Sequence, residues 1–272
     1  MAGWSEGEIV ARESALHYYR MGSPEKPTVL LLHGFTDSGL CWLRFANELA
    51  ADYDVIMTDA VGHGKSGDLS HGFRERAVAD VLAVMDALGV ERPALIGHSM
   101  GGATAAGVAA AAPDRVRALV LEDPGWRDDP APSGDPALPS SNPYAEWVRT
   151  FQTLSPGERV REAAAKEPNW AESEMPPWIE SKVQFDPTGF DHPRPAPNPW
   201  RAVAAQVICP TLLVTSDPAR GGIITPRQAA EIMGLLANGR VANIPDAGHN
   251  IRRDNYALFR DVVRAFLGEV GE

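Results

Sequence analysis

The sequence predicts an α/β protein with a mostly parallel, doubly wound sheet of the eight-stranded type, flanked by helices and carrying a helical cap insertion. Short apolar runs alternate with segments of helical periodicity, which is typical of a parallel sheet covered on both faces. The 272-residue length allows a large domain with a full core and an insertion. Residues 124–199 interrupt the alternation, because they hold 15 of the 23 prolines and have no evident strand pattern.

The elements can be placed in chain order from their periodicity. Rough alternation over residues 8–19 indicates a hairpin at the sheet edge, and the unbroken apolar run 28–32 indicates a strand buried on both faces. Gly89 and Pro113 mark the ends of two of the predicted helices. The remaining strands are predicted at 53–59, 94–97, 116–121, 210–215 and 239–244, and the helices at 41–49, 73–89, 102–112, 225–236 and 256–267.

The composition change divides the chain into a core domain, 1–123 and 200–272, and a cap, 124–199. Helical spacing within the cap is clearest over 144–154, 156–166 and 177–184. Four of the seven tryptophans lie in this stretch, which argues against a disordered linker. A cap rich in aromatic residues and proline can form a rigid apolar wall over the sheet.

Composition and charge narrow the class of partner. The net charge of −11 argues against nucleic acid and gives no reason to expect an anionic membrane surface. No apolar run approaches the roughly 20 residues that span a bilayer, and the acidic N-terminus does not read as a signal peptide. Cys41 and Cys209 are expected to be free thiols in a cytoplasmic protein. No metal spacing or cofactor motif is evident, and the oligomeric state, monomer or homodimer, stays open.

Ser99 lies in the stretch around which the chain is organised. It follows a short apolar strand, precedes a helix rich in Ala and Gly, and is flanked by Gly97 and Gly101 at the G-x-S-x-G spacing. A serine on such a tight turn is strained, and its neighbours must be small to let the chain pass. The hydroxyl then projects clear of the backbone beside a helix N-terminus that favours negative charge.

A second polar residue, His249, follows the last predicted strand. The carboxyl ends of parallel strands share one edge of a sheet, where ligands bind, so Ser99 and His249 are expected to converge. A serine hydroxyl becomes a nucleophile when a base takes its proton and a third group orients that base. The sequence therefore predicts Ser99 as nucleophile and His249 as base.

These motifs, with His33-Gly34-Phe35, Asp59 and the run 62–66 (Gly-His-Gly-Lys-Ser), resemble the capped, serine-nucleophile members of the α/β-hydrolase superfamily. They occur in the family's order over residues 28–267. The resemblance implies an oxyanion hole made by the backbone N–H groups of Phe35 and Met100, and a third, acidic member of the triad.

The acid is the point at which the sequence departs from the family pattern. The family often places it a few residues beyond the strand at 211–215, where the only carboxylate is Asp217, directly after the strand. Asp217 is therefore the predicted acid. Some relatives use the preceding strand, which makes Glu122 the alternative. Asp123 comes third, because it could instead fix the loop.

The resemblance implies a cofactor-free serine hydrolase that cleaves a carboxylic ester or lactone of a small to medium, largely apolar molecule. Alternatives on the same fold are hydrolysis of a C–C bond in a diketone, a lyase or perhydrolase reaction, and ligand binding without catalysis. Five aromatic residues are candidate walls of the substrate pocket: Trp42, Trp126, Trp147, Phe151 and Trp178.

Overall fold

Eight strands form one sheet in the order β1-β2-β4-β3-β5-β6-β7-β8. The computed structural model describes residues 4–11, 14–69, 76–127, 142–191 and 199–271. β1 and β2 form an antiparallel hairpin, β2 pairs antiparallel with β4, and every other pairing is parallel. The strands are β1 Ser5–Ala11, β2 Ser14–Met21, β3 Thr28–Leu32, β4 Asp54–Thr58, β5 Ala94–His98, β6 Ala118–Glu122, β7 Thr211–Thr215 and β8 Gly239–Asn243.

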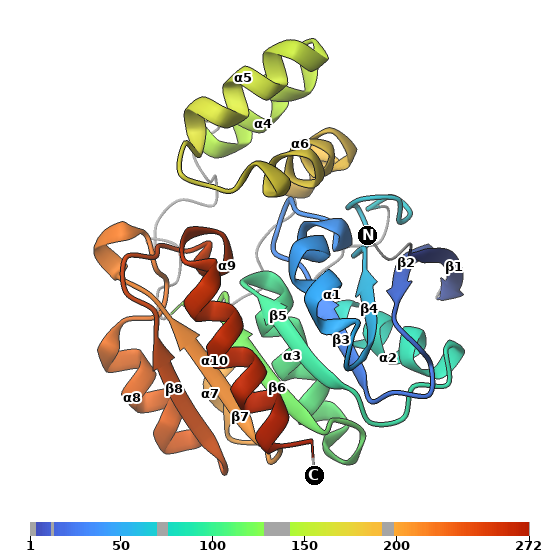
Figure 1. Cartoon of the computed structure of the whole chain (residues 1–272), viewed down its shortest axis with the longest axis vertical. Coiled ribbons are helices and arrows are strands. Elements are labelled where there is room, and N and C mark those ends of the chain that lie inside the picture. The colour runs from blue at the N-terminus through green and yellow to red at the C-terminus, as the bar shows by residue number, and fades with distance from the viewer. Residues whose placement is uncertain (1–3, 12–13, 70–75, 128–141, 192–198, 272) are drawn as a thin grey trace.

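Helices cover both faces of this sheet (Figure 1). One face packs on α1 (Leu43–Leu49) and α10 (Tyr256–Glu269). The other packs on α2 (Ala77–Ala87), α3 (Met100–Ala111), α7 (Trp200–Ala204) and α8 (Pro226–Leu235). Successive side chains of β3 alternate between the two cores, Leu31 in the first and Leu32 in the second, as a fully buried strand requires. The fold class predicted from the sequence is confirmed.

Helices α4 (Pro143–Thr153), α5 (Pro156–Lys166) and α6 (Met175–Gln184) lie above the sheet (Figure 1). Short 3-10 turns lie between the longer elements: η1 Gly39–Trp42 before α1, η3 Glu172–Glu174 before α6, η4 Pro187–Phe190 after α6, and η5 Pro218–Arg220 after β7. The helices occupy the segment predicted as a cap, and their aromatic side chains pack around Cys41. That 124–199 is a separate unit stays a prediction.

The termini of several elements differ from the predicted ones. α3 begins at Met100, directly after Ser99, rather than at residue 102. α2 begins at Ala77, and residues 73–75 of the predicted helix 73–89 lie outside the described ranges. The short helix α9 (Ile251–Asp254) after His249 was not predicted. A further 3-10 turn, η2, spans Pro113–Arg115.

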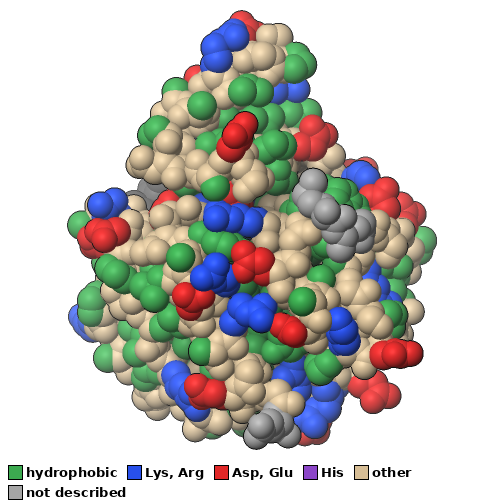
Figure 2. Space-filling view, in the orientation of Figure 1, with side chains coloured by type: hydrophobic (Ala, Val, Ile, Leu, Met, Phe, Trp, Pro, Cys, Tyr) green, Lys and Arg blue, Asp and Glu red, His purple; other side chains and the backbone are tan. Residues whose placement is uncertain are grey.

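Charged side chains of both signs are interspersed on the face that carries α1 and α10 (Figure 2). Arg264 contacts Asp52 there, and Arg260 contacts Glu48. Cys41 and Cys209 are free and buried. Within the described ranges, no helix is both long enough and apolar enough to cross a membrane.

Candidate active site

Ser99 occupies the single-residue corner between β5 and α3. Its backbone angles are φ 52° and ψ −112°, a region that a residue with a side chain enters only at a cost of about 1–3 kcal/mol. A Cβ on Gly97 would lie 2.2 Å from the Gly101 carbonyl oxygen, and one on Gly101 would lie 2.2 Å from that of Leu32. Both glycines are therefore required by close backbone approach, as the motif predicts.

His249 lies in the loop after β8, and its Nδ1 is 2.6 Å from Oδ2 of Asp123. Asp123 is fully buried, and its carboxylate also accepts the backbone N–H groups of Ile223 and Ile224. These fixed donors hold the carboxylate in place and stabilise its negative charge. Because a carboxylate can only accept, Nδ1 carries a proton in this contact, and in the neutral ring Nε2 then has the free lone pair.

The predicted pairing of Asp217 with His249 does not occur. The Asp217 carboxylate accepts the backbone N–H of Ala219 at 2.8 Å and so caps the 3-10 turn η5. Asp217 directly follows β7, and the chain turns there into η5 instead of carrying the carboxylate towards His249. Asp123, the third candidate of the sequence analysis, occupies that place.

Glu122, the predicted alternative, points into a different environment from its neighbour Asp123. It is the last residue of β6, and Arg252 binds both of its carboxylate oxygens, through the backbone N–H at 2.8 Å and through Nη1 at 3.0 Å. Burial raises the pKa of Glu122, and Arg252 opposes that rise. Consecutive residues at a strand end face opposite ways, so only one of this pair can reach His249.

The segment with the predicted oxyanion donor Phe35 packs directly on the Ser99 corner. A Cβ on Gly34 would lie 3.5 Å from Cβ of Ser99 and 2.6 Å from Nδ1 of His98. Residues 34–37 form a turn in which the N–H of Asp37 donates to the Gly34 carbonyl oxygen at 3.0 Å. Met100 is the first residue of α3, so its N–H has no acceptor within the helix. The donor roles of Phe35 and Met100 stay predictions.

His98 connects the Ser99 corner to the loop that carries His249. Its Nε2 is 2.9 Å from the backbone carbonyl oxygen of His249, and the two rings are 4.7 Å apart. Burial, followed by the charge of His249, holds the pKa of His98 well below its usual range. His98 is therefore a neutral donor through Nε2–H, and it fixes the loop that carries His249.

The five aromatic residues predicted as pocket walls are mostly packed within cores. Trp42 lies under α10 beside Phe45 and Phe259, and Trp126 stacks on Trp200 beneath the opposite face of the sheet. Both are essentially unexposed, because neighbouring helices cover them. The other three, Trp147, Phe151 and Trp178, pack on one another between α4 and α6.

The aromatic side chains in contact with Phe35 were not singled out from the sequence. Phe185 and Phe190 pack edge-on against the Phe35 ring, with ring centroids 5.0 and 5.3 Å from it. Both come from the end of α6 and from η4, far from Phe35 in the chain. No periodicity links such distant positions, so sequence patterning carried no signal for them.

Comparisons with known proteins identify the fold family of this chain. The family model for the alpha/beta hydrolase fold matches residues 27–175. The N-formylmaleamate deformylase of Pseudomonas putida is 29% identical over 94% of this chain and 95% of its own length.

Among solved structures, the N-formylmaleamic acid deformylase of Pseudomonas putida S16 aligns with a TM-score of 0.76 and 24% identity, over 95% of this chain and all of that one. The enol-lactonase of Burkholderia xenovorans LB400 aligns with a TM-score of 0.70 and 23% identity, over 96% of this chain and all of that one. The strained serine corner, the parallel sheet and the match over more than half of the sequence lead to one conclusion: this chain belongs to the alpha/beta hydrolase fold family.

Proposed function

We propose that this protein is a serine hydrolase that cleaves a carboxylic ester or lactone of a small to medium, largely apolar substrate. The observation that carries the proposal is the 2.6 Å contact between His249 Nδ1 and Asp123 Oδ2, at the sheet edge where Ser99 stands on its strained corner. The contact sets the tautomer that leaves His249 Nε2 able to accept the Ser99 proton.

In the proposed reaction, Ser99 Oγ attacks the substrate carbonyl carbon while His249 Nε2 takes the hydroxyl proton. The negative charge on the carbonyl oxygen is stabilised by the N–H groups of Phe35 and Met100, each worth roughly 3–4 kcal/mol of barrier. The C–O bond then breaks, and His249 returns its proton to the departing alkoxide. His249 next deprotonates a water molecule, which attacks the acyl-enzyme and releases the carboxylic acid and Ser99.

Two features of the surroundings support a small, apolar acyl substrate. Phe35, Phe185 and Phe190 form an aromatic cluster beside the segment that packs on Ser99. Ser99, Met100 and Phe35 are partly exposed rather than sealed, so a small molecule can approach them.

Hydrolysis of an N-formyl amide is the second candidate. The deformylase of Pseudomonas putida is similar to this chain over nearly the full length of both proteins, and an amide is attacked by the same groups. The two candidates differ in the leaving group, which is an alcohol in one and an amide nitrogen in the other.

The experiment compares the native chain with Ser99→Ala. The native protein should be labelled at Ser99 by a fluorophosphonate and should hydrolyse short p-nitrophenyl esters or a simple lactone. Ser99→Ala should lose the label and about 10³-fold or more of the turnover. Absence of labelling in the native protein would overturn the serine mechanism, whereas turnover of N-formylmaleamate but of no ester or lactone would select the second candidate.

A further inference from the structure

The turn at residues 34–37 contains a strained residue that the catalytic proposal leaves unexplained. Thr36 has φ 67°, and a β-branched side chain strongly disfavours this left-handed conformation. Such a conformation persists when the surrounding contacts determine it. Because Thr36 directly follows Phe35, the contacts that hold Thr36 also affect where the Phe35 N–H points.

The contacts to Thr36 from outside its own loop come from α4 and α6. Nζ of Lys182 in α6 donates to the Thr36 carbonyl oxygen at 2.9 Å. The Thr36 hydroxyl is 2.7 Å from the hydroxyl of Tyr144 in α4. Helices distant in sequence thus contact both the backbone and the side chain of the strained residue.

The ammonium group of Lys182 is buried and hydrogen-bonded. Its side chain is 1% exposed, and its other donations go to Oδ1 of Asp37 at 2.7 Å and to Oγ of Ser181 at 3.4 Å. The three protons of the ammonium therefore have three acceptors. These acceptors offset part of the cost of burying the ammonium group.

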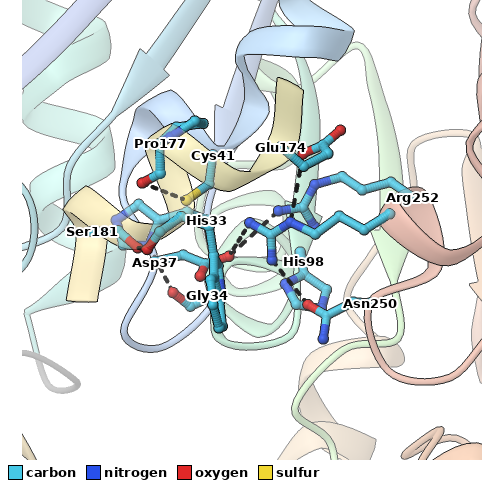
Figure 3. A network of polar contacts seen from close by, with 12 residues as sticks. His33, Gly34, Asp37, Cys41, His98, Glu174, Pro177, Ser181, Asn250 and Arg252 are labelled. Atoms are coloured by element: carbon cyan, nitrogen blue, oxygen red, sulfur yellow. Dashed lines mark hydrogen bonds and ion pairs between the residues drawn. The ribbon is translucent and has the colours of Figure 1, made fainter. Parts of the chain in front are cut away.

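Asp37 gives Lys182 a fixed anion to bind. Its second carboxylate oxygen accepts Nη2 of Arg253 at 2.9 Å and lies 3.5 Å from Nη2 of Arg252 (Figure 3). Burial would raise the pKa of Asp37, but Arg253, Lys182 and Arg252 together hold it well below its usual range. Both arginines belong to α9, directly after His249. Asp37 thus links α6, the 34–37 turn and the segment that bears the proposed base.

We propose that Lys182 is a positioning residue for the oxyanion hole: by binding the Thr36 carbonyl and Asp37, it holds the strained turn in which the Phe35 N–H faces the reacting carbonyl oxygen. This inference rests on the proposed serine hydrolase function. Lys182 touches no reacting atom, so it acts on the transition state through the turn and not on the bound ground-state substrate.

The test is Lys182→Met, which keeps most of the buried stem and removes the ammonium. We expect kcat for a p-nitrophenyl ester to fall about 10- to 100-fold, less than the about 10²–10³-fold loss of a direct oxyanion donor, with KM within about twofold. Phenylboronic acid forms a tetrahedral adduct on the serine that places an oxygen in the oxyanion hole, so its inhibition constant should rise by a similar factor.

The matched control is Lys26→Met. Lys26 also donates to backbone carbonyl oxygens, those of Ala50 and Ala51, but at the opposite edge of the sheet. Its kcat and boronate inhibition should equal those of the native protein. Circular dichroism and thermal melting of both variants establish that they fold.

A second measurement distinguishes positioning from simple attachment of α6. Glycine adopts φ near +67° without strain, so Thr36→Gly should make the turn less dependent on Lys182. We expect Lys182→Met to cost kcat less in the Thr36→Gly background than in the native one. An equal cost in both backgrounds, or a raised KM with unchanged kcat and unchanged boronate inhibition, would overturn the inference. Absence of serine labelling in the native protein would instead refute the proposed function.

Discussion

At the scale of single residues, the choice of acid depends on where adjacent carboxylates point. Asp123 holds His249 by Nδ1, while Asp217 caps η5 through the N–H of Ala219. We predict that Asp123→Asn lowers kcat by about 10³–10⁴-fold, because an amide cannot hold the reactive tautomer. Asp217→Asn should keep kcat within about threefold, since asparagine also caps turns.

Steady-state kinetics with one p-nitrophenyl ester, on variants of matched thermal stability, check this prediction. The result that contradicts it is a variant of Asp123 with near-native turnover beside a variant of Asp217 without turnover. Such a result would return Asp217 to the role that the sequence analysis gave it.

Residues whose position depends on local spacing could be placed from the sequence, and those whose position depends on the path of the chain could not. Ser99 follows from two glycines at fixed distances, and the structure gives the steric reason for both. The position of His249 after the last strand is equally local. The acid required knowing that Asp123 turns into the φ 39° conformation and meets the N–H groups of residues 223 and 224, 100 positions away.

At the scale of elements, α9 is held to the sheet by a buried ion pair between Arg252 and Glu122. Both side chains are at most 2% exposed, so removing one partner leaves an uncompensated buried charge or forces its neutralisation. We predict that Arg252→Met lowers the free energy of unfolding by about 3–5 kcal/mol. Urea denaturation followed by fluorescence measures the change.

The matched control is Arg264→Met in the neighbouring helix α10, which removes an exposed ion pair with Asp52. Exposed pairs contribute at most about 1 kcal/mol, so its denaturation midpoint should hardly move. Replacing both buried partners, as Glu122→Met with Arg252→Met, should recover part of the lost stability. Equal effects of Arg252→Met and Arg264→Met would contradict the assignment of a buried, mutually dependent pair.

The strands of the sheet were predictable from the sequence, whereas the contacts that α4 and α6 make with the sheet domain were not. Strands buried on both faces leave unbroken apolar runs, and seven of the eight observed strands follow such runs or the edge hairpin. The remaining strand, β8, lacks such an apolar run, and its side chains are largely exposed. For α4 and α6 the helices were predicted, but their contacts with Thr36 join residues 108 and 146 positions apart, which no local pattern encodes.

At the scale of the whole molecule, three buried histidines connect the stability of the fold to pH. Burial lowers the pKa of His33, and lowers those of His63 and His98 well below their ordinary value of 6.5. As the pH falls through 6.5, these histidines take up protons more readily in the unfolded chain than in the folded one, where burial favours the neutral ring. The unfolded state then binds more protons, so stability decreases as the pH is lowered.

If all three histidines titrate only in the unfolded chain, the free energy of unfolding decreases by at most about 4 kcal/mol from pH 7.5 to pH 5.5. Glu122, whose pKa is raised by burial, acts in the opposite direction as the pH falls, and so reduces this net decrease. Urea denaturation across the window should show the decrease, and His63→Gln should lower the slope by up to one proton, because glutamine does not titrate. A slope unchanged by His63→Gln, or equal stability at both pH values, would contradict the prediction; agreement would mean that these three buried histidines lower the stability of the fold at acidic pH.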